Sequence, residues 1–323
     1  MRKTFFLVAC MIAVQRGLSQ QLPIFSLYHE NGFVLNPAIT GVEDHGVIAA
    51  SYRDQWNRME GHPRTLSASY RTPVSRTNIG LGGHIVYDVT GPTSYTGATV
   101  TFAYHVSFRK IQPFHWARFL RNSKISAGIA LSGYYYQLKS SELVLENPVD
   151  QAVSRDDQSA FLPNAGLGIY YYYDKFFLGF AAPQLIPLTA RFKAADATTR
   201  IKRVNHYYVH AGGKIPLGGK VPRGYYNKIY LEPMVWLNYV KGAPLQYDAY
   251  FRIRHKNFIW GGAGYRSSKT VFVDIGCLIR KQMQLGYAYD LQVGRHRAQL
   301  GHTHEIILAF HFPSRQGSSF GVR

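Results

Sequence analysis

Short segments in which apolar and polar residues alternate dominate residues 46–312 of the chain. Alternation with a period of two is typical of β-strands whose two faces meet different surroundings. After the first residues, no stretch approaches the roughly 20 consecutive apolar residues that a membrane-spanning helix requires. Because lipid offers no hydrogen-bond partners to open strand edges, such strands can cross a membrane only as a closed barrel.

About 14 strands are predicted between the turn signals, and no amphipathic helix of more than about three turns competes with them. They cover residues 46–53, 65–71, 78–88, 95–108, 124–138, 164–173, 176–182, 204–215, 227–240, 245–255, 258–266, 271–280, 283–291 and 303–312.

The two faces of the predicted strands differ as a membrane barrel requires. In the strand at 245–255, Tyr247 and Phe251 share one face, whereas Asp248 and Arg252 share the other. An apolar face suits lipid and a polar face suits a lumen. A soluble β-sandwich also alternates, but these apolar faces repeatedly end in Tyr or Trp, as at a membrane interface. We therefore predict an all-β, antiparallel outer-membrane barrel.

The start of the chain has the features of a secretory signal peptide. Arg2 and Lys3 precede an apolar run over residues 4–14, and small residues follow at Gly17 and Ser19. We predict cleavage after Ser19. The expected organisation is then a signal peptide at 1–19, an N-terminal segment at 20–45, a barrel at 46–312 and a tail at 313–323.

Neither cysteine is expected to carry a lipid, form a disulfide or bind a metal. Cys10 ends a sequence that mimics a lipoprotein box, but the apolar run continues past it, so a cysteine in a discarded leader is favoured over lipidation. Cys277 is then the one thiol of the exported chain. This excludes an internal disulfide and a cysteine-based metal site.

The formal charge of +19 falls to +16 when Arg2, Lys3 and Arg16 leave with the signal peptide. Such basicity in a cytosolic protein would suggest nucleic acid, but export argues against that partner. The basic residues are spread over turns and strand ends. We interpret them as contacts to the phosphates of outer-membrane lipid and lipopolysaccharide, in preference to a dedicated anion site.

Connection lengths predict the orientation of the barrel. With both termini in the periplasm, the long connections near residues 54–64, 140–159 and 183–203 face outward, and tight turns near 173–175 and 255–257 face the periplasm. The basic and aromatic connection at 109–122 is an exception, since it is long but periplasmic. It is either a docking surface for a periplasmic partner or an insertion that lies against headgroups.

No catalytic motif is found in the predicted strands: the chain lacks H-E-x-x-H and G-x-x-x-x-G-K-[ST] sequences and a G-x-S-x-G elbow between a strand and a helix. The sequence Gly317-Ser-Ser-Phe-Gly321 matches the letters of G-x-S-x-G, but it lies in the tail, after the last predicted strand. His302 and His304 share a strand face, but two imidazoles without a third ligand indicate a wet strand end more than a metal site. Asp156 and Asp157 are expected to remain hydrated in a loop. We predict no enzyme, no cofactor and no metal.

Charged residues of the later strands are expected to brace the barrel interior through ion pairs. This predicted network consists of Glu232, Asp248, Asp274, Asp290, Arg252, Arg254 and Arg280. Residues 20–45 are predicted to fold against the barrel mouth or into its lumen, or else to be a plain linker. Asn36-Pro37 favours an extended or turn conformation there.

Motifs along the exported chain, in order, resemble those of the PorP/SprF family of outer-membrane proteins, which is associated with type IX secretion in Bacteroidota. The motifs are Leu35-Asn-Pro-Ala-Ile-Thr-Gly41, Ser51-Tyr-Arg-Asp-Gln-Trp56, Gly61-His-Pro-Arg-Thr-Leu-Ser67, Ile79-Gly-Leu-Gly-Gly83, Asp88 with Gly91-Pro92, Pro163-Asn-Ala-Gly-Leu-Gly-Ile-Tyr-Tyr171, Tyr239-Val-Lys-Gly-Ala-Pro244, Gly264-Tyr-Arg-Ser267, Leu285-Gly-Tyr-Ala-Tyr-Asp290 and His304-Glu-Ile-Ile-Leu308.

The resemblance implies a barrel that supports secretion or surface attachment of large cargo proteins, in some members gliding adhesins, without catalysis. It implies partners among the periplasmic and inner-membrane subunits of the type IX machinery. It also marks motif residues as structural or docking positions: Asn36, Pro37, Gly41, Tyr52, Arg53, Gln55, Trp56, Asp88, Gly91, Lys241, Gly242, Tyr265, Arg266, Tyr289, Asp290, His304 and Glu305. Arg53, Gln55 and Trp56 are expected to anchor the end of the first strand at the membrane interface.

Two other functions stay open at this point. A polar lumen face would suit an outer-membrane porin for small solutes, although Tyr230, Trp236 and Tyr250 would crowd it. A soluble, secreted carbohydrate-binding sandwich would require that the chain be absent from membranes.

Overall fold

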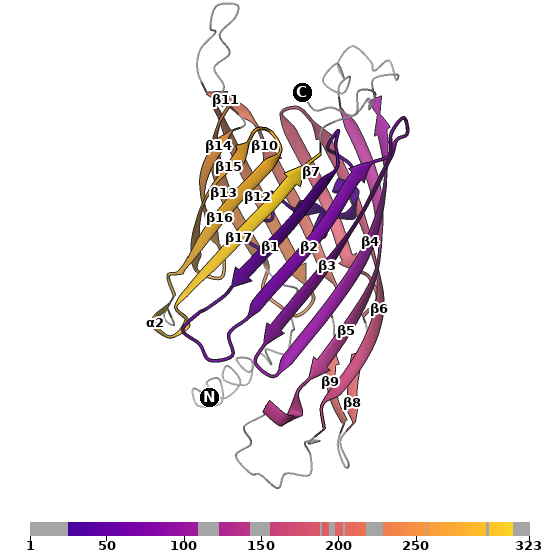
Figure 1. Cartoon of the computed structure of the whole chain (residues 1–323), viewed down its shortest axis with the longest axis vertical. Coiled ribbons are helices and arrows are strands. Elements are labelled where there is room, and N and C mark those ends of the chain that lie inside the picture. The colour runs from indigo at the N-terminus through magenta and orange to yellow at the C-terminus, as the bar shows by residue number, and fades with distance from the viewer. Residues whose placement is uncertain are drawn as a thin grey trace, which may run out of the picture.

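The chain forms a closed antiparallel β-barrel, shown in Figure 1 as tilted strands around a central space. This computed structural model describes residues 25–108, 123–142, 156–187, 189–193, 198–202, 204–217, 229–256, 258–294 and 297–312. The signal peptide, the 109–122 connection and the tail at 313–323 therefore lie outside the described residues. Among the described residues, no helix is long and apolar enough to cross a membrane.

The wall is a single sheet. Its strands are β1 (Val47–Asp54), β2 (Arg64–Pro73), β3 (Ile79–Thr90), β4 (Thr93–Ser107), β5 (Lys124–Leu138), β6 (Gln158–Tyr173), β7 (Phe176–Gln184), β10 (His206–Gly213), β11 (Ile215–Leu217), β12 (Ile229–Val240), β13 (Gln246–His255), β14 (Ile259–Arg266), β15 (Thr270–Ile279), β16 (Met283–Gln292) and β17 (His302–His311).

Two pairings close this sheet. β1 pairs with β17, placing Val47 opposite His311, and β10 pairs with β12, placing Gly212 opposite Met234. β11 continues β10 along β12, with Ile215 opposite Leu231. When β10 and β11 are counted as one strand, the described residues form a barrel of 14 strands. The predicted all-β barrel is confirmed.

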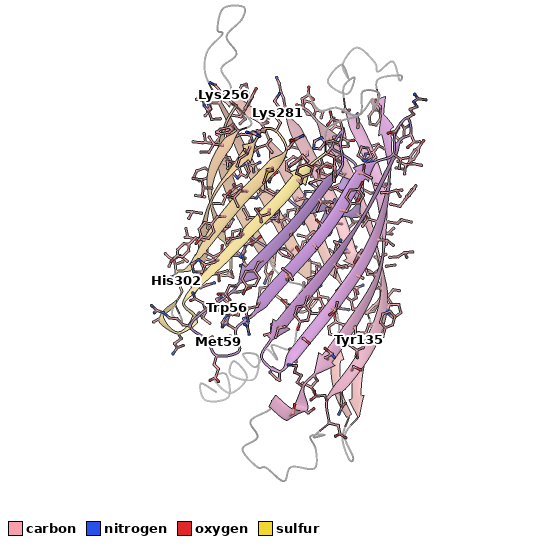
Figure 2. The ribbon with its side chains drawn as sticks, in the orientation of Figure 1. Trp56, Met59, Tyr135, Lys256, Lys281 and His302 are labelled. Carbon is pink, nitrogen blue, oxygen red and sulfur yellow. The ribbon has the colours of Figure 1, made fainter. Side chains whose placement is uncertain are left out.

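The predicted alternation of apolar and polar residues corresponds to the outer and inner faces of the barrel wall. In β13, Tyr247, Phe251 and Ile253 are exposed on the outer surface, whereas Asp248 and Arg252 are buried inside. Apolar side chains project outward from strands around the barrel in Figure 2. Lipid is the environment in which such an outer surface is stable.

Two regions differ from the sequence-based expectation. The predicted loop at 183–203 contains a small hairpin, β8 (Thr189–Lys193) with β9 (Thr198–Lys202). β6 also begins at Gln158 instead of residue 164, and runs through Pro163. The β6–β7 ladder starts only at Leu167, so Pro163 occupies an edge, where a missing N–H group is tolerated.

The connections divide between the two ends of the barrel. We call the "loop mouth" the end with the β1–β2, β3–β4, β5–β6, β7–β10, β12–β13, β14–β15 and β16–β17 connections. It is the lower end in Figure 1 and includes α2 (Arg297–Leu300). The opposite end, with the short β2–β3, β6–β7, β13–β14 and β15–β16 turns, is the "turn mouth". β1 begins and β17 ends at the turn mouth.

Candidate functional site

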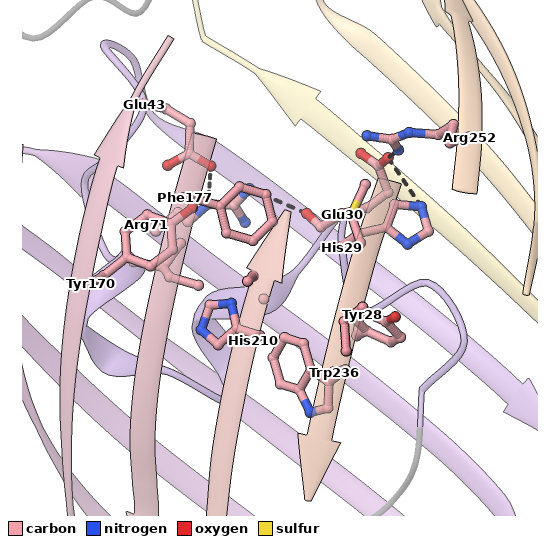
Figure 3. Close-up of a pocket in the computed structure, with 15 residues that line it drawn as sticks. Tyr28, His29, Glu30, Glu43, Arg71, Tyr170, Phe177, His210, Trp236 and Arg252 are labelled. Atoms are coloured by element: carbon pink, nitrogen blue, oxygen red, sulfur yellow. Dashed lines mark hydrogen bonds and ion pairs between the residues drawn. The ribbon is translucent and has the colours of Figure 1, made fainter. Parts of the chain in front are cut away.

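Residues 25–45, which we call the lumenal segment, lie inside the barrel. Leu27, Phe33 and Ala38 are each at most 1% exposed. Leu27 packs against the inward-facing Ala49 and Ile307. The segment contains two short 3-10 turns, η1 (Gly32–Val34) and η2 (Pro37–Ile39). Figure 3 shows part of it crossing the barrel interior, with Tyr28 beside Trp236 and Glu30 beside Arg252.

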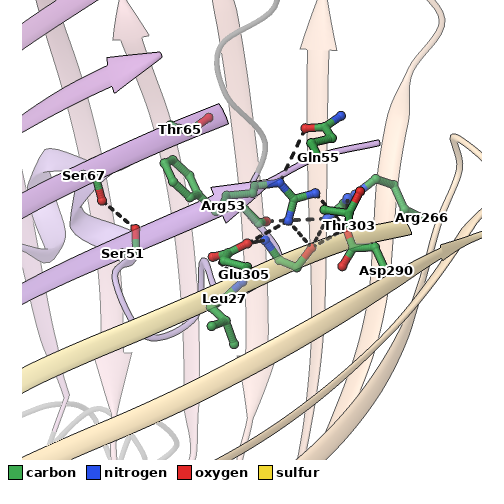
Figure 4. A network of polar contacts seen from close by, with 12 residues as sticks. Leu27, Ser51, Arg53, Gln55, Thr65, Ser67, Arg266, Asp290, Thr303 and Glu305 are labelled. Atoms are coloured by element: carbon green, nitrogen blue, oxygen red, sulfur yellow. Dashed lines mark hydrogen bonds and ion pairs between the residues drawn. The ribbon is translucent and has the colours of Figure 1, made fainter. Parts of the chain in front are cut away.

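A group of charged side chains holds the beginning of the segment near the loop mouth. We call it the clamp, and it consists of Ser26, Arg53, Asp248, Arg266, Asp290 and Glu305. Its members come from five strands and from the lumenal segment, as Figure 4 shows for most of them.

Arg53 is the centre of the clamp. Its Nη1 lies 2.8 Å from Glu305 Oε2, and its Nη2 lies 2.7 Å from Asp290 Oδ2. All three side chains are 2% exposed. Arg266 joins them through Asp290 at 3.4 Å and Asp248 at 3.0 Å. Charge-assisted hydrogen bonds are stronger than neutral ones, and this geometry gives each guanidinium several oxygen partners.

The clamp binds main-chain groups of the lumenal segment. Glu305 accepts hydrogen bonds from the backbone N–H of Ser26 at 2.6 Å and of Leu27 at 3.2 Å. The Ser26 hydroxyl donates to Asp290 at 2.8 Å. The clamp contains three carboxylates and two guanidinium groups, so the two amides and the hydroxyl supply donors to the excess negative charge.

Glu30 makes a second ionic contact farther along the segment. Its carboxylate pairs with Arg252 and accepts a hydrogen bond from Gln284 Nε2 at 2.6 Å. Arg252 in turn pairs with Glu232 at 2.6 Å, and Arg254 contacts the same Glu232 at 3.2 Å. The charged residues of β12 and β13 thus bind the segment as well as each other.

Arg71 of β2 ties two distant parts of the segment together. Its Nε donates to Glu43 at 2.7 Å, and its Nη1 donates to Asn31 Oδ1 at 3.0 Å. Its guanidinium also lies 5.2 Å from the centre of the Phe33 ring, in cation–π contact. Residues 31–43 are therefore folded into a compact turn above Arg71.

The later part of the segment is bound by neutral groups. The Asn36 side chain caps η2 by accepting the N–H of Ala38 at 3.0 Å, and its amide lies 3.0 Å from His210 Nε2. Ser126 donates to the Ala38 carbonyl at 2.6 Å. Thr40 donates to Thr101 at 2.9 Å.

Glycines in the wall allow the segment to approach closely. A Cβ built on Gly128 would lie 2.4 Å from the backbone of Ala38, and one on Gly168 would lie 2.1 Å from Asn36 Oδ1. A Cβ on Gly80 would lie 2.0 Å from the Thr40 carbonyl oxygen. Only glycine fits at these positions while the segment stays in place.

A cavity of about 150 Å³ remains between the segment and the wall. Its floor is aromatic, with the His210 and Trp236 rings stacked at 4.5 Å and Tyr170 stacked on His210 at 5.6 Å. The pairs Glu43–Arg71 and Glu30–Arg252 lie at its edge (Figure 3). The cavity is comparable to a site for one small ring.

The structure places the motif residues in three environments. The clamp unites Arg53, Arg266, Asp290 and Glu305, while Asn36, Pro37 and Gly41 lie in the lumenal segment. The outer surface carries Tyr52, Tyr265, Tyr289 and His304. The loop mouth carries Gln55, Trp56, Asp88, Gly91, Lys241 and Gly242. The expected interface anchor therefore fails for Arg53, whose side chain is buried in the lumen.

The expected ion-pair network is present except for two of its members. Asp274 accepts a hydrogen bond from Tyr250 at 2.6 Å and lies 3.6 Å from His29, and it makes no ion pair with an arginine among the described residues. Arg280 lies exposed in the β15–β16 turn, so it is not part of the network. Ser26, Glu30 and His210 make important contacts that the sequence did not single out. The parity of β1, in which Ala49, Ser51 and Arg53 share the inner face, was the available signal for Arg53.

The outward histidines bind tyrosines. Tyr289 Oη lies 2.6 Å from His302 Nδ1, and Tyr287 Oη lies 2.7 Å from His304 Nδ1. In the part of the chain that the structure describes, no group of three potential ligands could hold a metal ion. Asp157 accepts hydrogen bonds from Ser141 in the β5–β6 connection.

The chain is similar to one protein family and to several solved barrels. The family model for the "Type IX secretion system membrane protein PorP/SprF" matches residues 17–310. No curated protein matches the sequence.

Among solved structures, the CymD monoaromatic hydrocarbon channel superposes with a TM-score of 0.51 at 10% identity, covering 87% of this chain and 91% of that one. The toluene transporter TodX of Pseudomonas putida gives 0.47 at 9% identity, with coverages of 91% and 95%. Omp33 of Acinetobacter baumannii gives 0.45 at 8% identity, with coverages of 84% and 100%. At these identities the likeness concerns the fold alone.

Proposed function

The chain belongs to the PorP/SprF family of type IX secretion system membrane proteins, and we propose that it acts as a closed outer-membrane scaffold that docks exported cargo at its loop mouth. Its location is the outer membrane, which fits the barrel fold and the apolar outer surface. Membership of a secretion system implies partners in the machinery. The role proposed is protein–protein binding without catalysis.

The occupied lumen is the observation that carries this proposal. Backbone and side-chain groups of the lumenal segment contact both sides of the barrel, from Glu305 and Arg252 to Ser126 and Thr101. A diffusion porin requires an aqueous path. A barrel whose interior is occupied by a segment bonded to its wall is better suited to hold partners on its surfaces than to pass solutes.

The loop mouth is the proposed cargo surface. It carries the β8–β9 hairpin, the long β5–β6 connection and the motif residues Trp56 and Lys241. Loops on a rigid barrel commonly provide binding residues, because their sequence can vary without disturbing the wall. The turn mouth faces the periplasmic machinery in this arrangement.

Affinity purification from membranes tests the proposal. The wild-type barrel is compared with a variant in which residues 187–203, including the hairpin, are replaced by a short Gly-Ser linker. We expect the variant to lose secreted cargo and to retain the periplasmic subunits. A matched control replaces the short β15–β16 turn, residues 280–282, with Gly-Ser residues and should retain cargo. Cargo that remains bound to the hairpin variant would contradict docking at this hairpin.

Deleting residues 22–40 tests the role of the lumenal segment. We expect the deletion to lower the stability of the folded barrel and to impair secretion, because the clamp would lose the amides that it binds. Unchanged stability and secretion in this variant would refute a sealing role for the segment.

A further inference from the structure

The lumenal segment enters the barrel at the loop mouth. The carbonyl of Phe25 accepts a hydrogen bond from Arg266, the last residue of β14. The next residue, Ser26, binds Asp290 near the end of β16 and Glu305 near the start of β17. All three strand ends belong to the loop mouth.

The segment leaves the barrel at the turn mouth. Glu30 already reaches Gln284, the second residue of β16, at the opposite end of that strand. His45 Nε2 lies 2.8 Å from the ring of His311, the last residue of β17. Gly46 bonds Phe312 and continues into β1. Residues 25–45 therefore thread the whole lumen before the first strand begins.

The lengths of the connections indicate which mouth is extracellular and which is periplasmic. Outer-membrane barrels have short periplasmic turns and longer extracellular loops. The longest connections, β5–β6 and β7–β10, lie at the loop mouth. Tight turns at 174–175, 256–258 and 280–282 lie at the turn mouth, although the β3–β4 and β14–β15 turns of the loop mouth are equally short. The loop mouth is thus the extracellular end.

We propose that the chain enters its own barrel from the cell surface at Phe25, and that it passes inward through the lumen before forming β1. This differs from the expectation that both ends of the chain face the periplasm, since an even number of strands fixes only where β1 begins and β17 ends. The clamp then closes the lumen at the extracellular end, because Glu305 binds the backbone N–H groups of Ser26 and Leu27.

This threading gives an extracellular protein direct access to the seal. Phe25 lies at the loop mouth and is followed by Ser26, so a partner that binds the chain there acts directly on the Glu305 and Asp290 contacts. Threading of the lumen requires only the barrel and its orientation, and does not require cargo to bind at the loop mouth. A variant can therefore lose cargo binding and still display residues before Ser26 on the cell surface.

Cysteine labelling of intact cells tests the inference. In a Cys277→Ser background, one cysteine is introduced by Leu22→Cys, Met59→Cys or Lys281→Cys. Met59 lies at the loop mouth and Lys281 at the turn mouth (Figure 2). With a membrane-impermeant maleimide, we expect Leu22→Cys to label as strongly as Met59→Cys, and at least about tenfold more than Lys281→Cys.

A second measurement does not depend on where the signal peptide is cleaved. An epitope inserted between residues 24 and 25 remains with the exported chain and should bind antibody on intact cells. Heat-modifiable gel migration first establishes that each variant is folded. Labelling and antibody binding that occur only after permeabilisation, as for Lys281→Cys, would overturn the proposal. So would labelling of Lys281→Cys in place of Met59→Cys, because the barrel would then be oriented the other way.

Discussion

Opposite sides of the barrel hold the same segment by different chemistry. The charged wall, formed by β1 and β12–β17, binds residues 25–30 through the clamp and the Glu30 contacts. The hydroxyl wall, formed by β4–β6, binds residues 36–40 through Ser126, Thr101 and close contacts at glycine. The first wall relies on buried charges that need their partners, and the second relies on shape.

Substitutions in the two walls should therefore destabilise the barrel to different degrees. Removing one member of a buried ion pair leaves an uncompensated charge, which is strongly destabilising. Removing a neutral hydrogen bond has a smaller effect, and crowding a glycine site displaces the segment before it disturbs the wall. Four substitutions separate these effects.

Arg53→Ala should have the largest effect. It leaves Glu305 without its ion-pair partner and Asp290 with only Arg266, so we expect a loss of about 3 to 5 kcal/mol in the free energy of unfolding. Urea unfolding from lipid vesicles measures this quantity. The matched control is Arg58→Ala, which removes an exposed arginine and should change stability by about 0.5 kcal/mol or less. If Arg53→Ala and Arg58→Ala lowered the free energy of unfolding equally, the buried ion pairs of Arg53 would not be what stabilises the charged wall.

Gly128→Ala should come next, at about 1 to 3 kcal/mol, because the new Cβ would collide with the backbone of Ala38. Gly261→Ala is the control, since its Cβ would meet only the Asp274 carbonyl at 3.7 Å. Proteolysis of residues 25–45 in the folded barrel should increase for Gly128→Ala alone. An unchanged cleavage rate would show that the segment does not occupy this position.

Ser126→Ala removes the hydrogen bond to the Ala38 carbonyl and should cost about 1 kcal/mol. Ser132→Ala removes a bond of the same kind to Thr99, which joins only β5 to β4. Both variants should lose similar stability, but only Ser126→Ala should speed hydrogen exchange in residues 36–40. If both variants speed it equally, the wall and the segment unfold as one unit.

His304→Ala should have the smallest effect, about 0.5 kcal/mol, because its tyrosine contact is exposed on the outer surface. Its neighbour Glu305 faces inward and binds Arg53, Ser26 and Leu27. Glu305→Ala should therefore destabilise the barrel several times more, as measured by the same unfolding experiment. A reversed order would mean that the assigned faces of β17 are wrong.

The sequence predicted the wall far better than the site. Alternation specifies a strand and its faces locally, which is why β5 was predicted with the bounds that the structure shows, Lys124 to Leu138. The register that brings Arg53 beside Glu305 depends on closure between the first and last strands, which no local pattern contains. Motif similarity marked these residues without revealing that they meet.

The lumenal segment is the part that sequence reasoning located least well. Asn36-Pro37 indicated a turn, and η2 is such a turn. The partners of the segment come from strands around the whole barrel, and are separated from it by up to 279 residues, as for Ser26 and Glu305. The hairpin of β8 and β9 was missed because its strands are short and lie within a polar loop.

Single-channel recording in planar bilayers tests the central claim most directly. For the purified wild-type barrel, a closed scaffold predicts no stable conductance steps. The variant lacking residues 22–40, shown to be folded by heat-modifiable migration, should open steps of porin size. Steady ohmic conductance of the wild-type protein, equal to that of the deletion variant, would contradict the account and favour a diffusion pore.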